Sequence, residues 1–200
     1  MPGLFVTLEG IDRSGKTTQA RLLCEALGER ALAVREPGGT AVGERVREVL
    51  KDTSLAIGGV AEALLFAAAR AELVSEVIRP ALDAGKVVVS DRFLDSSLAY
   101  QGGARGLGVD EVERVNEFAT GGLRPEVTIL LDLAPTAAAA RAGVEVDRFE
   151  REGAGLQERV RDAYEELVAL EPRRWVRVDA DRDPDAVHRD VLAVVEGVLA

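Results

Sequence analysis

One glycine-rich segment near the start of the chain has the residue types and spacing of an anion-binding loop. It fits the pattern G-x-x-x-x-G-K-[ST] and runs Gly10-Ile11-Asp12-Arg13-Ser14-Gly15-Lys16-Thr17-Thr18. In such a loop, backbone N–H groups curl around phosphate oxygens at the start of a helix, the lysine reaches the β- and γ-phosphates, and the following hydroxyl can ligate Mg²⁺. The segment therefore predicts a nucleoside triphosphate site that uses Lys16 and Thr17.

A second pair of candidates follows the apolar run at 87–89. Asp91 could hold Mg²⁺ through water, and the guanidinium of Arg92 could bind a phosphate. A surface salt bridge is the alternative interpretation of such a pair. Combined with the glycine-rich loop, the pair suggests a site for two phosphate groups.

Two further segments combine rings with hydrogen-bonding side chains. Phe66 and Arg70 are four residues apart, so they share a face if their segment is helical. A helix would likewise gather Ser97, Tyr100 and Gln101. A ring can stack on a nucleobase, and an arginine or amide can bind the edge of the base. The alternatives are a core phenylalanine, a solvated arginine and a polar helix end.

Charged residues in two other segments could also reach a phosphate. Glu36 begins a turn rich in glycine, and Arg47 lies one to two turns into the next helix, where it could bind an acceptor phosphate. The basic, glycine-containing stretch at about 141–155 predicts a lid that adds positive charge and excludes water. Its arginines include Arg141, Arg148 and Arg151. An ordinary charged helix with i,i+4 ion pairs is the alternative.

The elements that must position these residues alternate between short apolar runs and longer helical patterns. We expect strands at 4–8, 31–34, 87–89, 127–133 and 175–178. Most of these runs are continuously apolar, which is typical of strands covered on both faces. Helices are expected at 16–28, 43–50, 60–84, 110–120, 136–141, 156–170 and 184–199. Glycine pairs such as Gly102-Gly103 are expected to separate elements. The pattern predicts a three-layer α/β P-loop NTPase fold, with a central parallel five-stranded sheet flanked by helices.

Composition limits the class of protein. The 200 residues suffice for one domain, which we expect to span 1–200. With 25 Lys and Arg against 35 Asp and Glu, the net charge of -10 disfavours nucleic acid as a partner. The single cysteine and single histidine exclude a disulfide framework and a Cys/His zinc cluster. We expect no export signal and no membrane span, and hence a cytoplasmic location.

Together the motifs resemble the thymidylate kinase family, nucleoside monophosphate kinases that phosphorylate dTMP with ATP. The resemblance spans nearly the whole chain. It rests on Leu8-Glu9-Gly10 with the phosphate loop, Arg35-Glu36-Pro37-Gly38-Gly39, Leu65-Phe66-Ala67-Ala68-Ala69-Arg70, Ser90-Asp91-Arg92-Phe93, Asp95-Ser96-Ser97-Leu98-Ala99-Tyr100-Gln101-Gly102, Asp147-Arg148-Phe149-Glu150 and Val178-Asp179-Ala180. It implies a dTMP kinase of dTTP synthesis that uses ATP and Mg²⁺ and forms a homodimer. A kinase for another nucleotide or deoxynucleoside, and a P-loop nucleotide switch, are the alternatives.

The resemblance also implies roles for individual residues. For the dTMP site these are Phe66 on thymine, Arg70, Ser97 and Gln101 at its polar edge, Tyr100 at the deoxyribose, Arg47 and Arg92 at the phosphate, and Asp12 and Glu36 beside it. For the ATP site they are Lys16, Thr17 and Thr18 at the phosphates and Mg²⁺, Glu9 and Asp91 near the metal, Arg141 near adenine, and Arg148 and Arg151 closing over the ATP.

Arg13 departs from the pattern of many bacterial members that this chain resembles. Those members have glycine at this position and supply a catalytic arginine from the lid. Arg13 is similar to the eukaryotic arrangement, in which the arginine comes from the loop. Since this chain has both Arg13 and a basic lid, we expect Arg13 to neutralise the transferring phosphoryl group, with a lid arginine as the alternative.

Overall fold

The computed structural model describes residues 3–141, 148–149 and 152–200, and its centre is a parallel sheet. The five strands have the order β2-β3-β1-β4-β5. They are β1 (Leu4–Glu9), β2 (Ala31–Arg35), β3 (Val87–Asp91), β4 (Val127–Asp132) and β5 (Trp175–Asp179). The predicted five-stranded sheet is confirmed, and each strand ends within two residues of its expected position.

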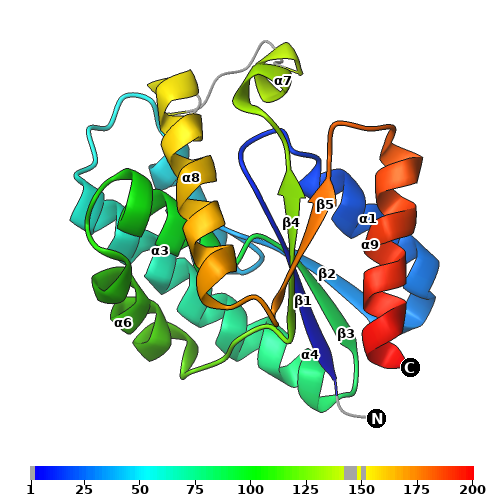
Figure 1. Cartoon of the computed structure of the whole chain (residues 1–200). Coiled ribbons are helices and arrows are strands. Elements are labelled where there is room, and N and C mark those ends of the chain that lie inside the picture. Colours follow the sequence, from blue (N-terminus) through cyan, green and yellow to red (C-terminus); the bar gives the residue numbers. More distant parts are fainter. Residues whose placement is uncertain (1–2, 142–147, 150–151) are drawn as a thin grey trace.

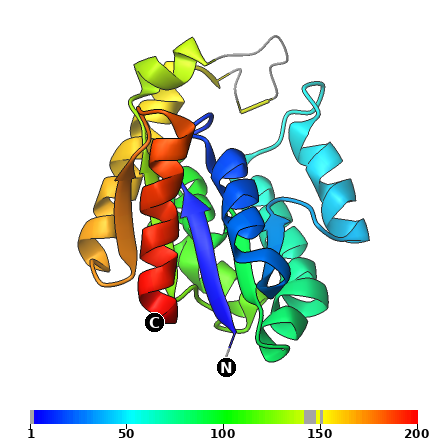
Figure 2. The same ribbon diagram turned by 90° about the vertical axis from the view of Figure 1, so that its right-hand side faces the viewer.

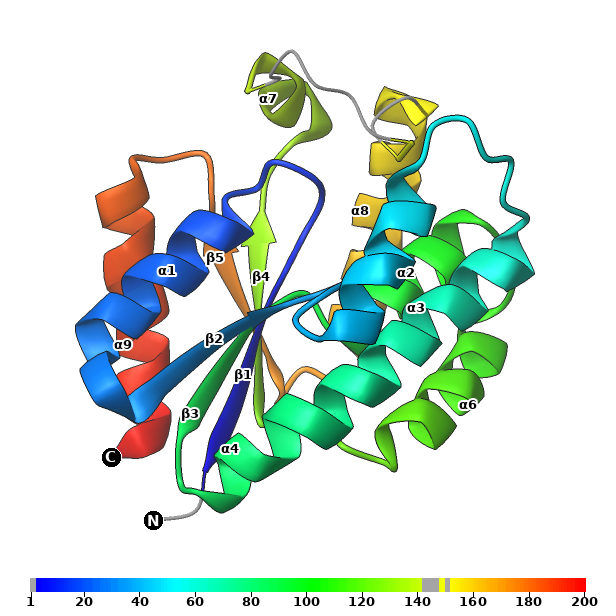
Figure 3. The same ribbon diagram turned by 180° about the vertical axis from the view of Figure 1, so that it is seen from behind.

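Helices cover both faces of the sheet and complete the predicted three layers. In Figure 1, α1 and α9 lie on one face, and α3, α4, α6 and α8 lie on the other; Figure 3 shows α2 beside α3. The helices are α1 (Lys16–Leu27), α2 (Ala41–Lys51), α3 (Gly59–Leu73), α4 (Arg79–Asp83), α5 (Leu94–Ser97), α6 (Val109–Thr120), α7 (Pro135–Ala140), α8 (Ala154–Leu170) and α9 (Pro184–Leu199), with short helical turns η1 (Gly28–Arg30), η2 (Val74–Ile78) and η3 (Leu98–Ala104). No helix in the described part of the chain is both long enough and apolar enough to span a membrane.

The central strands are buried, and most of their residues are apolar. Every residue of β1 is buried, as are all but the last residues of β3 and β4. The edge strands β2 and β5 are only partly buried. Figure 2 shows that β1 begins beside the end of α9, away from the edge where the strands end. Open α/β sheets bind ligands at the edge where the strands end.

The long helix predicted at 60–84 is continuous but not uniform. A π-helical turn, η2, lies between α3 and α4, just before Pro80. Proline has no N–H to donate and its ring clashes with the preceding turn of an α-helix, so a widened turn accommodates it without ending the helix.

The prediction that Gly102-Gly103 separates two elements is wrong, because both residues lie inside η3. A Cβ on Gly103 would lie 2.6 Å from the Cβ of Ala163 on α8. The glycine therefore allows η3 to pack closely against α8, and it does not end the helix. This contact fixes the element that carries Tyr100 and Gln101.

Candidate active site

The phosphate loop lies between β1 and α1 and owes its shape to three left-handed residues. The φ angles are 137° at Gly10, 64° at Arg13 and 99° at Gly15. A Cβ on Gly10 would lie 2.7 Å from the carbonyl oxygen of Leu131 on β4, so only glycine fits there. The loop thus turns back over the end of the sheet, as the motif predicts.

The ammonium group of Lys16 lies inside this loop. Its Nζ donates to the carbonyl oxygens of Gly10 at 3.1 Å and Ile11 at 2.6 Å, and to Ser14 Oγ at 3.3 Å. Burial, helped by the charge of Arg92, lowers the pKa of Lys16 to about 8, against the opposing effect of nearby carboxylates. A cation that burial disfavours in this way is stabilised by an incoming anion.

Two cavities meet at the phosphate loop. The first, of about 280 Å³, extends from the loop towards α3 and η3; the second, of about 510 Å³, lies between the starts of α1 and α9. Arg13, Lys16 and Thr17 line both. The other predicted residues on the first cavity are Asp12, Glu36, Arg47, Phe66, Asp91, Arg92, Ser97, Tyr100 and Gln101. Those on the second are Ser14, Gly15, Thr18 and Arg141.

The predicted metal pair comes together where the cavities meet. Thr17 Oγ1 donates to Asp91 Oδ2 at 2.5 Å. Among the described residues there is no group of three or more His, Cys, Asp or Glu side chains able to hold a metal. A hydroxyl and a carboxylate fit Mg²⁺, which prefers oxygen and takes few protein ligands beside substrate phosphates.

Arg92 joins the first cavity to the phosphate loop. Its NH2 lies 2.5 Å from Asp12 Oδ1, and its NH1 donates to the Gly10 carbonyl at 3.1 Å and to Ser96 Oγ at 3.0 Å. Its guanidinium carbon also lies 5.1 Å from the centroid of the Tyr100 ring. Burial would raise the pKa of Asp12, but the charges of Arg92 and Lys16 more than offset it and lower that pKa. The backbone of Arg92 is left-handed, with a φ of 72°, which marks a position held by its surroundings.

Arg70 lies behind the wall of the first cavity, not on it. Two of its N–H groups face Glu36 Oε2, at 2.8 and 2.5 Å, and two others donate to Ser97 Oγ at 3.1 Å and to Asn116 Oδ1. The fifth donates to the carbonyl oxygen of Phe93 at 3.0 Å. Because arginine has five N–H donors, a direct hydrogen bond from Arg70 to a base would require one of these bonds to open. Burial raises the pKa of Glu36, although Arg70 opposes that shift.

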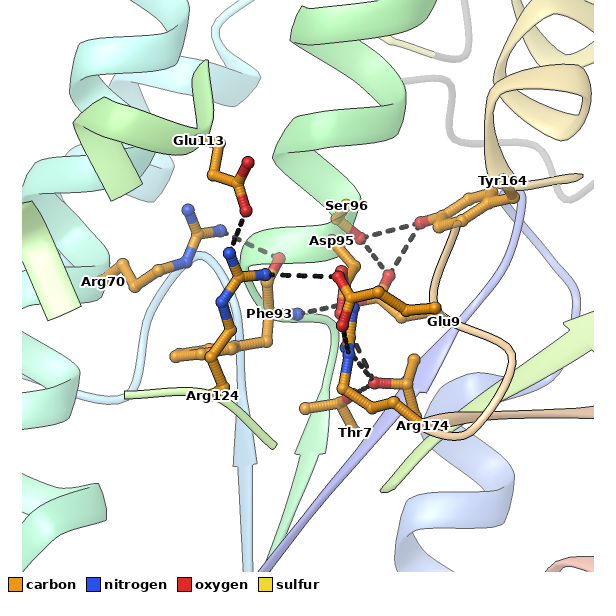
Figure 4. A network of polar contacts seen from close by, with 12 residues as sticks. Thr7, Glu9, Arg70, Phe93, Asp95, Ser96, Glu113, Arg124, Tyr164 and Arg174 are labelled. Atoms are coloured by element: carbon orange, nitrogen blue, oxygen red, sulfur yellow. Dashed lines mark hydrogen bonds and ion pairs between the residues drawn. The ribbon is translucent and has the colours of Figure 1, made fainter. Parts of the chain in front are cut away.

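Glu9, expected near the metal, lies beneath the site. Its carboxylate accepts from the Phe93 N–H at 2.8 Å, from Ser96 Oγ at 2.6 Å and from Tyr164 Oη at 2.7 Å (Figure 4). Burial raises the pKa of Glu9 to about 7. Within the described chain Glu9 lines neither cavity. Its hydrogen bonds therefore support α5 and α8, and it does not join Thr17 and Asp91.

The arginines of the predicted lid differ in where they lie. Arg141 donates to the Ala180 carbonyl at 2.8 Å and lines the second cavity. Arg148, expected over the ATP, instead donates to the Leu50 carbonyl at 2.9 Å and to Glu62 Oε2 at 2.6 Å, which ties it to α2 and α3. Arg151 lies outside the described residues.

Sequence reasoning missed several side chains of the first cavity. The ring of Phe149 lies 5.9 Å from that of Phe66 and 6.5 Å from that of Tyr100, between centroids. Phe149 directly follows Arg148 in a family motif, and this position could have identified it as a residue of the site. The lining residues without an assigned role are Arg35, Pro37, Leu50, Lys51, Ser96 and Phe149. Aromatic rings thus surround one end of the cavity and charges the other.

Comparison with known proteins agrees with this geometry. The family model described as thymidylate kinase matches residues 8–191. The chain is 51% identical to the thymidylate kinase of Symbiobacterium thermophilum, over 98% of this chain and 94% of that protein. It is 48% identical to that of Thermoanaerobacter sp. over the full length of both, and 50% identical to that of Desulforudis audaxviator over 100% of this chain and 93% of that protein. The chain therefore belongs to the thymidylate kinase family.

Proposed function

We propose that the chain transfers the γ-phosphoryl group of ATP to dTMP, forming ADP and dTDP for dTTP synthesis. The observation that carries this proposal is the meeting of two cavities at Arg13, Lys16 and Thr17. A switch protein needs one nucleotide site, whereas a monophosphate kinase needs two that share a transfer point. Membership of the thymidylate kinase family supports the same reaction.

In this proposal dTMP occupies the first cavity and ATP the second. The thymine lies at the aromatic end, against Phe66 and near Gln101, and its deoxyribose lies near Tyr100. The acceptor phosphate is then close to Arg92 and Arg47, at the end of the cavity that the phosphate loop lines. The donor phosphates follow the loop, with the adenine near Arg141.

The residues act on the reaction through alignment and charge. The attacking phosphate oxygen is already ionised at neutral pH, so no general base is required. Lys16 and Arg13 stabilise charge that develops on the transferring group, and Arg92 holds the attacking phosphate in line. Thr17 and Asp91 would hold Mg²⁺, which when bound neutralises charge on the donor phosphates.

The source of the catalytic arginine is tested by Arg13→Gly. Glycine suits the left-handed backbone at this position, so the variant removes the guanidinium without new strain. We expect kcat to fall on the order of 10²–10³-fold, the effect of losing one preorganised charge at the transition state. Steady-state rates with saturating Mg·ATP and dTMP measure it. Turnover near that of the wild type would move the role to a lid arginine.

The reaction itself is tested by ADP release with separate acceptors. We expect fast release from Mg·ATP with dTMP, weaker release with dUMP, release with dCMP that is measurable only at high enzyme concentration, and none above background with dAMP, dGMP or thymidine. Turnover of thymidine would indicate a deoxynucleoside kinase, which must deprotonate a neutral hydroxyl. Release that no acceptor stimulates would contradict a two-substrate kinase and favour a nucleotide switch.

The remaining expectations from the sequence stay predictions. These are a single domain over 1–200, a cytoplasmic location and a homodimer. Three exposed apolar side chains on the neighbouring helices α3 and α6 support the homodimer: Val60 is 63% exposed, Leu64 52% and Phe118 92%. Burying such side chains between two copies would remove apolar surface from water.

A further inference from the structure

Glu62 on α3 is a buried carboxylate that the proposed chemistry does not use. It is 0% exposed. Its Oε1 accepts from Gln101 Nε2 at 2.7 Å and from Arg105 Nε at 2.5 Å, and its Oε2 accepts from Arg105 NH2 at 2.9 Å and from Arg148 NH2 at 2.6 Å. Donors from η3, from Arg105 directly after it and from the lid region therefore converge on one side chain that is fully removed from water.

The position of Glu62 on its helix connects it with the first cavity. Glu62, Phe66 and Arg70 are spaced four residues apart, so they follow one another along one face of α3. Phe66 lines the cavity, and so does Gln101, the residue that Glu62 holds. Glu62 is thus placed to act on the base end of the cavity through Gln101.

The charge of Glu62 decides which way the amide of Gln101 faces. An ionised carboxylate can only accept hydrogen bonds, so it must receive the NH2 end of the amide and not the carbonyl end. The Oε1 of Gln101 then faces away from Glu62, and no described residue donates to it. Gln101 therefore offers the cavity a hydrogen-bond acceptor.

Ser97, on the same cavity, is set in the opposite sense. Its Oγ accepts a hydrogen bond from Arg70 NH1 at 3.1 Å, which leaves its own proton for an acceptor. An acceptor and a donor on the same cavity match the N3–H and C4=O of thymine or uracil. Cytosine presents the reverse pattern, an N3 acceptor and an amino donor.

We propose that Glu62 is a positioning residue that fixes the amide of Gln101 with its carbonyl oxygen towards the base, so that the cavity selects a pyrimidine with N3–H over cytosine. This inference rests on the proposed function, since it concerns the acceptor nucleotide. Glu62 does not touch the substrate; it acts through Gln101.

Glu62→Gln tests the proposal because it changes hydrogen-bond polarity at nearly constant shape. Arg105 NH2 and Arg148 both donate to the Oε2 position, and Arg105 Nε donates to the Oε1 position. The new carbonyl oxygen should keep the two bonds at the Oε2 position, while the new NH2 faces Gln101 and loses the bond from Arg105 Nε. The amide of Gln101 must then turn its carbonyl to residue 62 and its NH2 to the base. That arrangement disfavours N3–H and suits the N3 of cytosine.

The measurement is kcat/KM for dTMP and for dCMP, with the KM for ATP recorded alongside. For Glu62→Gln we expect the ratio of the two efficiencies to fall by about 10- to 100-fold, the effect of one mispaired hydrogen bond in a buried site. The KM for ATP should stay unchanged. Glu62→Asp keeps a carboxylate but shortens its reach to Gln101, so it should lower the ratio measurably and by less than Glu62→Gln does. Glu72→Gln, on the same helix outside both cavities, should match the wild type.

The outcomes separate this inference from the proposed function. Wild-type protein that does not phosphorylate dTMP would overturn the function. Wild type that prefers dTMP, together with a Glu62→Gln variant that keeps the same ratio, would overturn only the role of Glu62. An equal loss of efficiency with both acceptors would do the same, since a purely structural role weakens both.

A second design covers the case in which Glu62→Gln does not fold. Glu62→Asp and Gln101→Leu are then combined in a double-mutant cycle on the same ratio. If Glu62 acts through Gln101, the effect of Glu62→Asp should vanish once the amide is gone. An undiminished effect in the Gln101→Leu background would contradict the proposal.

Discussion

Replacing Lys16 with alanine is expected to lower kcat on the order of 10³-fold while the protein stays folded. The ammonium lies inside the phosphate loop, at the point shared by both cavities, and three loop oxygens hold it within 3.3 Å. A fixed cation at this point stabilises charge that develops in the transition state, and its loss acts on turnover more than on substrate binding. Steady-state kinetics with both substrates varied separates the two effects.

The chain offers a matched control for this variant. Lys86 lies just before β3, at the end of the sheet away from the site, and donates to the Glu29 carbonyl at 3.2 Å. Lys86→Ala should therefore keep wild-type turnover. A Lys16→Ala enzyme with near-normal kcat would contradict both the assigned role of the loop and the transfer point we propose.

The second large effect is expected for Arg92→Ala. Arg92 is the side chain that links Asp12, the Gly10 carbonyl and Ser96 at the phosphate end of the first cavity. Without Arg92 the acceptor phosphate loses the paired N–H donors of the guanidinium and is no longer held in line for the transfer. The kcat/KM for dTMP should therefore fall on the order of 10³-fold. The free energy of unfolding should also decrease by about 1–3 kcal/mol, because Asp12 loses its ion-pair partner.

Arg92→Gly separates the catalytic effect from the structural one. The φ of 72° suits glycine better than alanine, so the glycine variant should be more stable than the alanine variant by about 1 kcal/mol. Both should show the same loss of activity. Thermal unfolding and kinetics on the two proteins test this pairing. If activity recovered together with stability, Arg92 would be a structural residue only.

The parts of the molecule that were predictable are those encoded by neighbours in the sequence. A mostly apolar run such as β1 indicates a buried strand, because both of its faces must be covered. The loop from Gly10 to Thr18 is likewise local, since its glycines, lysine and hydroxyl act within one turn. The helical periodicity that joins Phe66 to Arg70 also follows from spacing alone.

What could not be predicted depends on contacts between distant segments. Arg70 meets partners that are 34, 27, 46 and 23 residues away in the sequence, and these contacts occupy all its donors behind the cavity wall. Glu62 belongs to a residue type that is usually exposed, and only the arrival of η3 and Arg148 explains its burial. Glu9 similarly ends a strand at the ligand edge, yet Tyr164 and Ser96 enclose it.

The meeting of the two cavities has a consequence for inhibitor design. Arg13, Lys16 and Thr17 line both cavities. A compound that joined thymidine to adenosine through a chain of phosphates could therefore occupy both cavities at once. Its second half would bind at a high effective concentration, so its affinity should exceed that of either nucleotide by about 10²–10⁴-fold. The same continuity implies that ADP and dTDP, whose facing phosphates would repel each other across one small space, hasten each other's departure after each turnover.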